Sequence, residues 1–390
     1  MIINLREILY HIVLKIIILC SIQGCSGAGE ASRATEDEFP GSSRLSELLG
    51  DRGVEGYAKA IEPRVFHFPA DHGPHPAYRN EWWYFTGNLD GADGERFGFE
   101  LTIFRFSLTP RTEAPAASAW RTNQVYIGHF AVTDVAEGNF HVAQRYSRGG
   151  VGLAGAAAQP FRVWLDDWSI AAADNEPSWR LRAADADIAL DLQLLPAKPV
   201  VLNGAEGLSQ KSSRVGNASY YYSMPRLRSA GRLTIGGRSY AVSGLSWLDR
   251  EWGSSALSPD QRGWDWFALQ LSDGTDLMFY TLRRNDGTRD RHSAGTWIDA
   301  DGRAHHLANE DVTIDVMDFW ESERGDRYPS AWDIVIPARE LSVRVTPVLD
   351  NQELITNVRY WEGAVDVDGL SGGRRIDGRG YVELTGYAGN

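Results

Sequence analysis

Strict alternation of apolar and polar residues is the feature that most restricts how this chain can fold. In the stretch "IALDLQLLP", the apolar side chains Ile188, Leu190, Leu192 and Leu194 occupy every second position. Successive side chains of a strand point to opposite faces, so this run predicts a sheet with one buried face and one solvent-exposed face. An amphipathic helix would need apolar residues three or four positions apart.

Hairpin signals recur along the chain. Expected strands at 82–89 and 97–106 flank an Asp-Gly turn, and Gly236-Gly237 is the expected tip of a second hairpin. The stretch "WDWFALQLSDGTDLMFYTLRR" predicts a third hairpin. Convincing long amphipathic helices are missing from the sequence. The pattern predicts an all-β fold of the sandwich or barrel type.

A short internal repeat indicates that the β-structure is duplicated. The segment "WYFTGNLDG" at 83–91 matches "WFALQLSDG" at 266–274 in the spacing of Trp, aromatic residue, alternating strand and Asp-Gly. We therefore expect two similar β-modules in one chain.

The N-terminus has the pattern of a targeting segment. Arg6 and Lys15 flank an apolar stretch that leads into "CSIQGCSG". We predict a lipoprotein signal peptide at 1–25 with lipidation of Cys25, then a flexible tether at 26–62. A plain signal peptide cut shortly after Cys25 is the alternative. The chain is thus expected to be exported and lipid-anchored to a bacterial membrane facing the periplasm, where a membrane transporter is a candidate partner.

Composition excludes several classes of protein. A net charge of −13 argues against nucleic acid as a partner. The two cysteines, Cys20 and Cys25, both lie in the targeting segment, so the body has no disulfide framework or thiol nucleophile.

Zinc-binding spacing, phosphate loops and dinucleotide fingerprints are missing, so we predict no metal and no cofactor. Ser246 in "GLSWL" lacks the Gly-x-Ser-x-Gly elbow, so no Ser triad supports a hydrolase.

The stretch "SGLSWLDREWGSS" at 243–255 raises the sharpest chemical question. Read as a strand, it places Trp247, Asp249 and Glu251 on one face, and Arg250 and Trp252 on the other. Charged side chains on both faces of a buried strand are costly unless they are paired or reach solvent. The sequence is also rich in indoles, with 14 Trp. Aromatic-lined concavities are therefore expected.

Five phrases in the same order carry a resemblance to a known family. They are "YRNEWWYFTGNL", "ASYYYSMPRL", "GLSWLDREWGSS", "GWDWFALQLSDG" and "GYVELTGY". Together they resemble the AttH/carotenoid 1,2-hydratase (hydroxyneurosporene synthase) group, in its lipocalin-like secreted "predicted hydrolase" branch, from about Phe66 to Tyr387. The resemblance implies two tandem lipocalin-like antiparallel β-barrels. We place them at 63–255 and 256–390, and a barrel of roughly eight strands can hold one small ligand.

The resemblance also implies a role for one carboxyl. In the hydratase branch an Asp in a similar phrase protonates an alkene, and Asp249 occupies that place. Addition of water to C=C needs an acid held against an apolar chain, and neighbouring indoles can shelter cationic charge. The structural alternative is that Asp249 and Glu251 pair with Arg250 or another arginine. The hydratases carry a His on the equivalent of "SYYYS", where this chain has tyrosines, which argues against carotenoid hydration itself.

The remaining candidate site residues come from the same phrases. Glu81 joins Asp249 and Glu251 as a catalytic candidate, with an ion-pair role as its alternative. The predicted ligand-binding residues are Trp82, Trp83, Tyr84, Tyr220, Tyr222, Trp247, Trp252, Trp266, Gln270 and Arg283. Aromatic core packing, and tyrosines bonded to backbone, are the structural alternatives for these positions.

Three functions fit these observations. The first is a cofactor-free hydratase or isomerase that acts on a hydrophobic, isoprenoid-like or lipid-like molecule by carboxyl-mediated proton transfer. The second is a non-catalytic periplasmic lipid-binding lipoprotein. The third is a carbohydrate-active hydrolase, because Asp249 and Glu251 on one strand face would have Cβ atoms roughly 6–7 Å apart.

Overall fold

The computed structural model describes residues 53–110, 118–173 and 178–389. The signal peptide at 1–25, the lipidation site Cys25 and the tether up to residue 52 lie outside these residues and stay predictions. The domain bounds at 63–255 and 256–390 also stay predictions. Among the described residues, no helix has the length and apolar character needed to cross a membrane.

The first sheet contains thirteen strands. They are β1 (Asn80–Gly91), β2 (Arg96–Ser107), β3 (Gln124–Asp134), β4 (Asn139–Arg148), β5 (Ala154–Ala158), β6 (Phe161–Leu165), β7 (Trp168–Ala172), β8 (Trp179–Asp185), β9 (Ile188–Pro196), β10 (Val201–Leu202), β11 (Leu208–Gln210), β12 (Ala218–Ile235) and β13 (Arg238–Gly253). Their order is β4-β3-β2-β1-β13-β12-β9-β8-β7-β6-β5, with β10 and β11 paired to β12. The two ends meet, because β3 and β4 contact β5 and β6, so this sheet is a nearly closed barrel.

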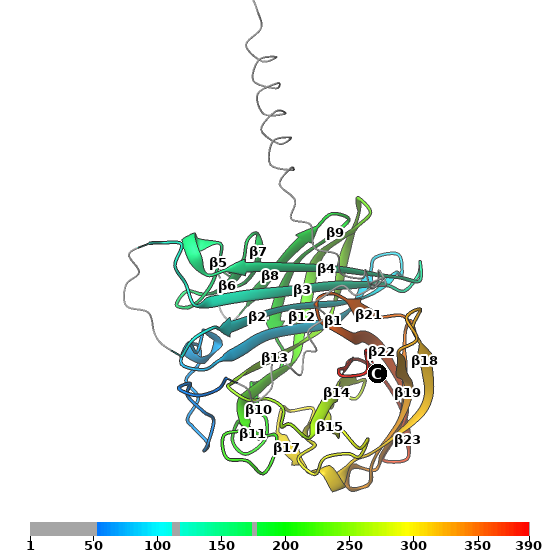
Figure 1. Cartoon of the computed structure of the whole chain (residues 1–390). Helices are drawn as coiled ribbons and strands as arrows, with labels where there is room; N and C mark the ends of the chain where they lie inside the picture. Colours follow the sequence, from blue (N-terminus) through cyan, green and yellow to red (C-terminus); the bar gives the residue numbers. More distant parts are fainter. Residues whose placement is uncertain (1–52, 111–117, 174–177, 390) are drawn as a thin grey trace, which may run out of the picture. The chain divides into compact units, whose positions relative to one another are not determined.

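The second sheet contains ten strands. They are β14 (Gln261–Leu271), β15 (Asp276–Arg284), β16 (Ala294–Ile298), β17 (Ala304–Leu307), β18 (Thr313–Glu321), β19 (Arg327–Ile336), β20 (Leu341–Pro347), β21 (Glu353–Ile355), β22 (Arg359–Ser371) and β23 (Arg374–Leu384). Their order is β17-β16-β15-β14-β23-β22-β20-β19-β18, with β21 paired to β22. Figure 1 shows the strands of this sheet from light green to red.

The all-β prediction is confirmed, and every strand pairing between named strands is antiparallel. The second sheet differs from the expected full barrel and forms a half-barrel. Its end strands β17 and β18 are not hydrogen-bonded to each other. The short strand β17 is followed by the 3-10 helix η3 (Asn309–Asp311), which turns the chain before β18 begins. The other 3-10 helices of the described residues are η1 (Ala70–His72), η2 (Gly150–Gly152) and η4 (Pro337–Arg339).

The two sheets share one strand order. In each sheet, the strand that carries the repeated Trp-aromatic motif pairs on one side with the strand that follows it and on the other with the last strand of the sheet. These strands are β1, between β2 and β13, and β14, between β15 and β23. The short sequence repeat therefore occupies equivalent positions in the two sheets.

The predicted hairpins form as expected. In the first of them, β1 pairs with β2 and places Glu81 opposite Arg105. In the β12–β13 hairpin, Ile235 lies opposite Arg238, and both glycines at the tip have positive φ, 56° at Gly236 and 80° at Gly237. A two-residue hairpin turn of this kind favours glycine because other residues rarely adopt positive φ.

Alternation divides the side chains of β1 and β13 between two environments. Trp83, Leu248 and Trp252 belong to the core inside the first barrel. Tyr84 and Trp247 point the other way and join a cluster that includes Trp266 of the second sheet. The outer face of the central strands in the first sheet therefore packs against the second sheet.

Polar bonds also join the two sheets within residues 53–389. Asn88 Nδ2 donates to the Gly380 carbonyl at 3.0 Å, and His129 Nδ1 is hydrogen-bonded to the Tyr360 hydroxyl at 2.7 Å. The buried carboxylate of Asp276 on β15 accepts from Lys198, whose Nζ lies 2.7 Å away. Burial raises the pKa of Asp276, but hydrogen bonds from Arg226 and Lys198 oppose that rise and hold the carboxylate at one edge of the contact.

Candidate active site

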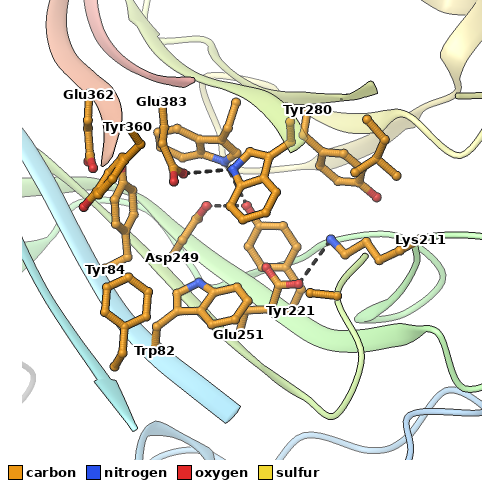
Figure 2. A pocket seen from close by; sticks show the side chains of 15 residues that line it. Trp82, Tyr84, Lys211, Tyr221, Asp249, Glu251, Tyr280, Tyr360, Glu362 and Glu383 are labelled. Atoms are coloured by element: carbon orange, nitrogen blue, oxygen red, sulfur yellow. Dashed lines mark hydrogen bonds and ion pairs between the residues drawn. The ribbon is translucent and has the colours of Figure 1, made fainter. Parts of the chain in front are cut away.

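A pocket lies between the two sheets rather than inside a barrel. It encloses about 700 Å3 of unfilled space, counting its open mouth. The side chains that line it come from both sheets and from the segments that follow β11 and β13: Trp82, Tyr84, Phe104, Lys211, Tyr221, Asp249, Glu251, Ala256, Trp264, Trp266, Tyr280, Leu282, Tyr360, Glu362 and Glu383. Figure 2 shows these side chains converging on one space, with Asp249 near its middle. The lining combines aromatic rings with four carboxyl groups, so it suits an apolar molecule that undergoes proton transfer.

Asp249 is held in the wall of this pocket by donors that carry no charge. The Tyr221 hydroxyl donates to Oδ2, while the Ser223 hydroxyl at 2.5 Å and Trp247 Nε1 at 2.7 Å donate to Oδ1. Within the described residues no cation forms an ion pair with it, and its exposed fraction is 3%. Burial raises the pKa of Asp249 to about 7, with the three hydrogen bonds opposing the rise and the charge of Glu251 adding to it.

Glu251 has a different environment two residues further along the same face. Its carboxylate lies 3.1 Å from Lys211 Nζ and accepts a hydrogen bond from the Ser219 hydroxyl. Burial opposes the charge on Lys211, but Glu251 and nearby acidic groups raise the pKa of the lysine overall. The Lys211 ammonium also lies 4.2 Å from the ring centroid of Tyr280. Glu251 and Lys211 therefore form a charged pair at one end of the pocket (Figure 2).

The second sheet contributes two more carboxyls, Glu362 on β22 and Glu383 on β23. Trp264 Nε1 donates to Glu383 Oε2 at 3.1 Å. Burial raises the pKa of Glu383 to about 8, and the charges of Asp249 and Glu251 add to the rise. Glu362 is fully buried, and neither of its oxygens has a hydrogen bond of normal geometry in the described part of the chain. Burial and the neighbouring acids raise the pKa of Glu362 well above its ordinary value.

Glu81 does not line the pocket but lies inside the first barrel. Its carboxylate bonds the guanidinium groups of Arg105 and Arg250 and accepts from the His75 backbone N–H at 3.0 Å. Burial alone would raise the pKa of Glu81, but the two arginines and His75 lower it overall. The structure therefore places Glu81 as an ion-pair partner, because side chains alternate and its neighbour Trp82 takes the pocket side.

The structure brings together five of the residues predicted from the sequence. Asp249, Glu251, Trp82, Tyr84 and Trp266 all line the pocket. They come from β1, β13 and β14, whose outward faces meet. Trp247 stands just behind them and donates to Asp249.

The other predicted residues point elsewhere. Trp83, Trp252, Tyr220 and Tyr222 belong to the core of the first barrel, because they lie on the inward face of β1, β13 or β12. The Tyr220 hydroxyl donates to the Glu62 carbonyl at 2.9 Å, and the Tyr222 hydroxyl is bonded to His72 at 2.6 Å.

Gln270 and Arg283 are also outside the pocket lining. Gln270 Nε2 donates to the backbone carbonyls of Pro225 and Ser246, at 2.7 Å and 3.2 Å, and so ties β14 to the first sheet. Arg283 Nε donates to Asp265 at 2.9 Å, because Arg283 faces away from the pocket while its neighbour Leu282 faces into it.

Sequence reasoning missed part of the site, including Lys211, Tyr221, Tyr280, Glu362 and Glu383. One signal was available for the two glutamates. Each interrupts an apolar or aromatic run, in "RYWEGAV" and "GYVELTG". A carboxyl between buried neighbours on a central strand is costly to bury unless it has a bonding partner or serves a function. Lys211 follows β11 in a loop, and no local pattern placed it near Glu251. Among the described residues, no group of three or more His, Cys, Asp or Glu side chains is arranged to hold a metal ion.

The titration of Asp249 can be observed through its partners. We expect the indole N–H resonance of Trp247 to shift with a midpoint near pH 7, because its acceptor gains charge as the raised pKa of Asp249 is passed. NMR of the indole region over pH 3–9 measures this. The Asp249→Asn protein should lack the transition. A midpoint close to the ordinary Asp value of 3.8 would show that the carboxyl is hydrated.

The fold and the pocket together define a class of protein: all-β chains in which two antiparallel sheets hold an aromatic, carboxyl-rich pocket between them. This chain belongs to the AttH-like family, whose sequence profile matches residues 59–387. The crystal structure of a protein from Nitrosomonas europaea assigned as AttH is 34% identical, with a TM-score of 0.75. The similarity covers 85% of this chain and 100% of that one.

Two further proteins are more distantly similar. The crystal structure of kievitone hydratase from Nectria haematococca is 16% identical with a TM-score of 0.64, over 86% of this chain and 97% of that one, which shows a shared fold. The dehydratase asqC of Emericella nidulans is 24% identical over 226 residues, which are 54% of this chain. The match spans 62% of asqC, less than two thirds of its length. The chain is thus related to a dehydratase and has the fold of a hydratase.

Proposed function

We propose that this protein is a hydro-lyase that adds water to, or removes it from, a carbon–carbon double bond of an apolar, isoprenoid-like molecule. One observation carries the proposal: Asp249 is a buried carboxyl that lacks a cationic partner among the described residues and lines an aromatic pocket. A carboxyl whose pKa is about 7 can both give and take a proton near neutral pH. The relationship to asqC and the fold shared with kievitone hydratase support the same reaction class.

The lining fits an apolar guest that carries a polar group at one end. Trp82, Trp264 and Trp266 supply large ring surfaces, which bury apolar area and can stabilise a developing cation. The Lys211–Glu251 pair offers a donor and an acceptor to a hydroxyl or carbonyl. No step of this reaction transfers electrons, so the chemistry requires acid and base groups alone.

A mass-spectrometric screen tests the proposal. The purified full chain is incubated in H2-18O with a panel of isoprenoid alkenes, the matching tertiary alcohols and kievitone. We expect at least one compound to gain or lose one water, with the heavy oxygen retained in the hydrated product. Heat-unfolded protein is the control. If the native chain binds panel compounds but changes none of them, it is a lipid-binding protein and the hydro-lyase proposal is contradicted.

A further inference from the structure

Three carboxyls on the far side of the pocket from Lys211, two of them fully buried and Glu383 half-buried, have no ionic partner in the described residues. Glu362 on β22 lines the pocket and is 0% exposed, and both of its oxygens lack a hydrogen bond of normal geometry. Glu383 on the neighbouring strand β23 also lines the pocket, and its carboxyl accepts one hydrogen bond, from Trp264. Glu100 on β2 is equally buried and equally unpartnered, but it does not line the pocket.

This arrangement contrasts with that of several other buried acids in the described residues. Glu81 has two arginines, Asp276 has Lys198 and Arg226, and Glu251 has Lys211. An ionised carboxylate without a partner is costly in a dry interior, so Glu362 is held there as the neutral acid. Its neutral O–H is a proton donor aimed into an aromatic pocket.

Asp249 lies in a different hydrogen-bonding environment across the same pocket. Three donors point at its oxygens, and one of them, Trp247 Nε1–H, can only donate. Hydrogen bonds of this kind favour the carboxylate form. Two carboxyls whose surroundings hold the proton with different strength can serve as an acid and a base toward one substrate.

We propose that Glu362, with Glu383 beside it, is the proton donor of the pocket and that Asp249 is the base that activates water. The inference rests on the proposed function and assigns direction to its proton transfers, with Asp249 as the base in place of the acid role that the resemblance implies. The raised pKa values of Glu362 and Glu383, against a pKa of about 7 for Asp249, agree with it.

The step balances without a further reactant. The Glu362 proton moves to one alkene carbon, and the π electron pair becomes the new C–H bond. The oxygen of water bonds to the other carbon and gives its proton to the Asp249 carboxylate. The protein then carries a proton on Asp249 and a charge on Glu362, and proton exchange through water at the pocket mouth restores both. Elimination of water is the same sequence reversed.

Groups on six strands and on the segment after β11 surround these two carboxyls and take part in any pH dependence. Those around Glu362 are Tyr84 on β1, Glu100 on β2, Tyr360 on β22, and Tyr381 and Glu383 on β23. Those around Asp249 are Tyr221 and Ser223 on β12, Trp247 and Glu251 on β13, Glu383 on β23 and the ammonium of Lys211 after β11. None of the groups around Glu362 is a cation.

The test compares Glu362→Gln with Glu100→Gln. Both remove a fully buried, unpartnered carboxyl and both should resist denaturant better than the wild type as pH rises above 4.5, because the wild-type acids must ionise against a raised pKa. Turnover of the compound found in the screen separates them. We expect Glu362→Gln to lose at least about 100-fold in kcat, while Glu100→Gln stays close to the wild type.

Two further measurements separate failure of this inference from failure of the proposed function. Full turnover in Glu362→Gln, with Asp249→Asn inactive, would overturn the inference and leave the hydro-lyase standing. If the wild type converts nothing in the panel, infrared difference spectra at pH 7 decide the point. A protonated-carboxyl C=O band that is lost in Glu362→Gln supports a neutral acid in the pocket, and a carboxylate band lost instead contradicts it.

Discussion

The Asp249→Asn protein should fold, bind the apolar substrate and lose about 100-fold or more of its turnover. Asparagine keeps the size of the side chain, and its amide oxygen can accept from Trp247 and Ser223, while the Tyr221 hydroxyl can turn to accept from the amide NH2. It cannot take up or release a proton at neutral pH. The loss should therefore appear in kcat and leave substrate binding almost unchanged.

Stability gives an internal control for this variant. The folded-state pKa of Asp249, about 7, lies above its ordinary value of 3.8, so ionisation of the buried carboxyl costs stability progressively between these pH values. Asparagine does not ionise, and the variant should resist denaturant at pH 8 at least as well as the wild type. Inactivity with a lowered unfolding midpoint would indicate structural damage, and full activity would remove Asp249 from the mechanism.

The Glu81→Gln protein should lose about 3–5 kcal/mol of folding free energy at neutral pH. The substitution leaves Arg105 and Arg250, whose exposed fractions are 1% and 0%, without their buried carboxylate. Since the folded-state pKa of Glu81 is lowered, its contribution is complete above its ordinary pKa and declines as pH falls below it. Urea denaturation followed by tryptophan fluorescence at pH 7 and pH 4 measures both effects.

Asp191→Asn is the matched control for this change. Asp191 also bonds two arginines, Arg180 and Arg182, but at the surface, where these side chains are 41–52% exposed. Water and salt screen such a pair, so we expect a loss of about 1 kcal/mol or less. Equal unfolding midpoints for Glu81→Gln and wild type would show that Glu81 is not structural. A stable but inactive Glu81→Gln protein would return it to the catalytic candidates.

Much of the fold follows from local patterns. The period of two residues is set by strand geometry, so the sequence alone divided β13 correctly into a face with Trp247, Asp249 and Glu251 and a face with Arg250 and Trp252. The Asp-Gly and Gly-Gly pairs likewise located the hairpins, because turn residues are also a local pattern. Closure of each sheet depends on contacts between strands distant in sequence, and the half-barrel form of the second sheet was therefore not predicted.

The candidate site was predictable only in part. Trp82, Tyr84, Asp249 and Glu251 lie in phrases dense enough in aromatic and acidic residues to attract attention. Glu362 stands alone in a strand more than a hundred residues from Asp249, and nothing local connects the two. The pocket between the sheets, rather than inside a barrel, was also not expected, because face-to-face packing of two sheets leaves no local pattern.

Glu81 and Asp249 together show which properties follow from the sequence and which follow from the tertiary structure. Sequence by itself determined that both are carboxylates beside tryptophan on central strands, and which neighbours share their faces. The tertiary structure decided their chemistry, because register places Arg105 directly opposite Glu81 while the face of Asp249 turns to hydroxyl and indole donors. Charge and protonation depend on partners a few ångströms away, and those partners come from strands that only folding brings together.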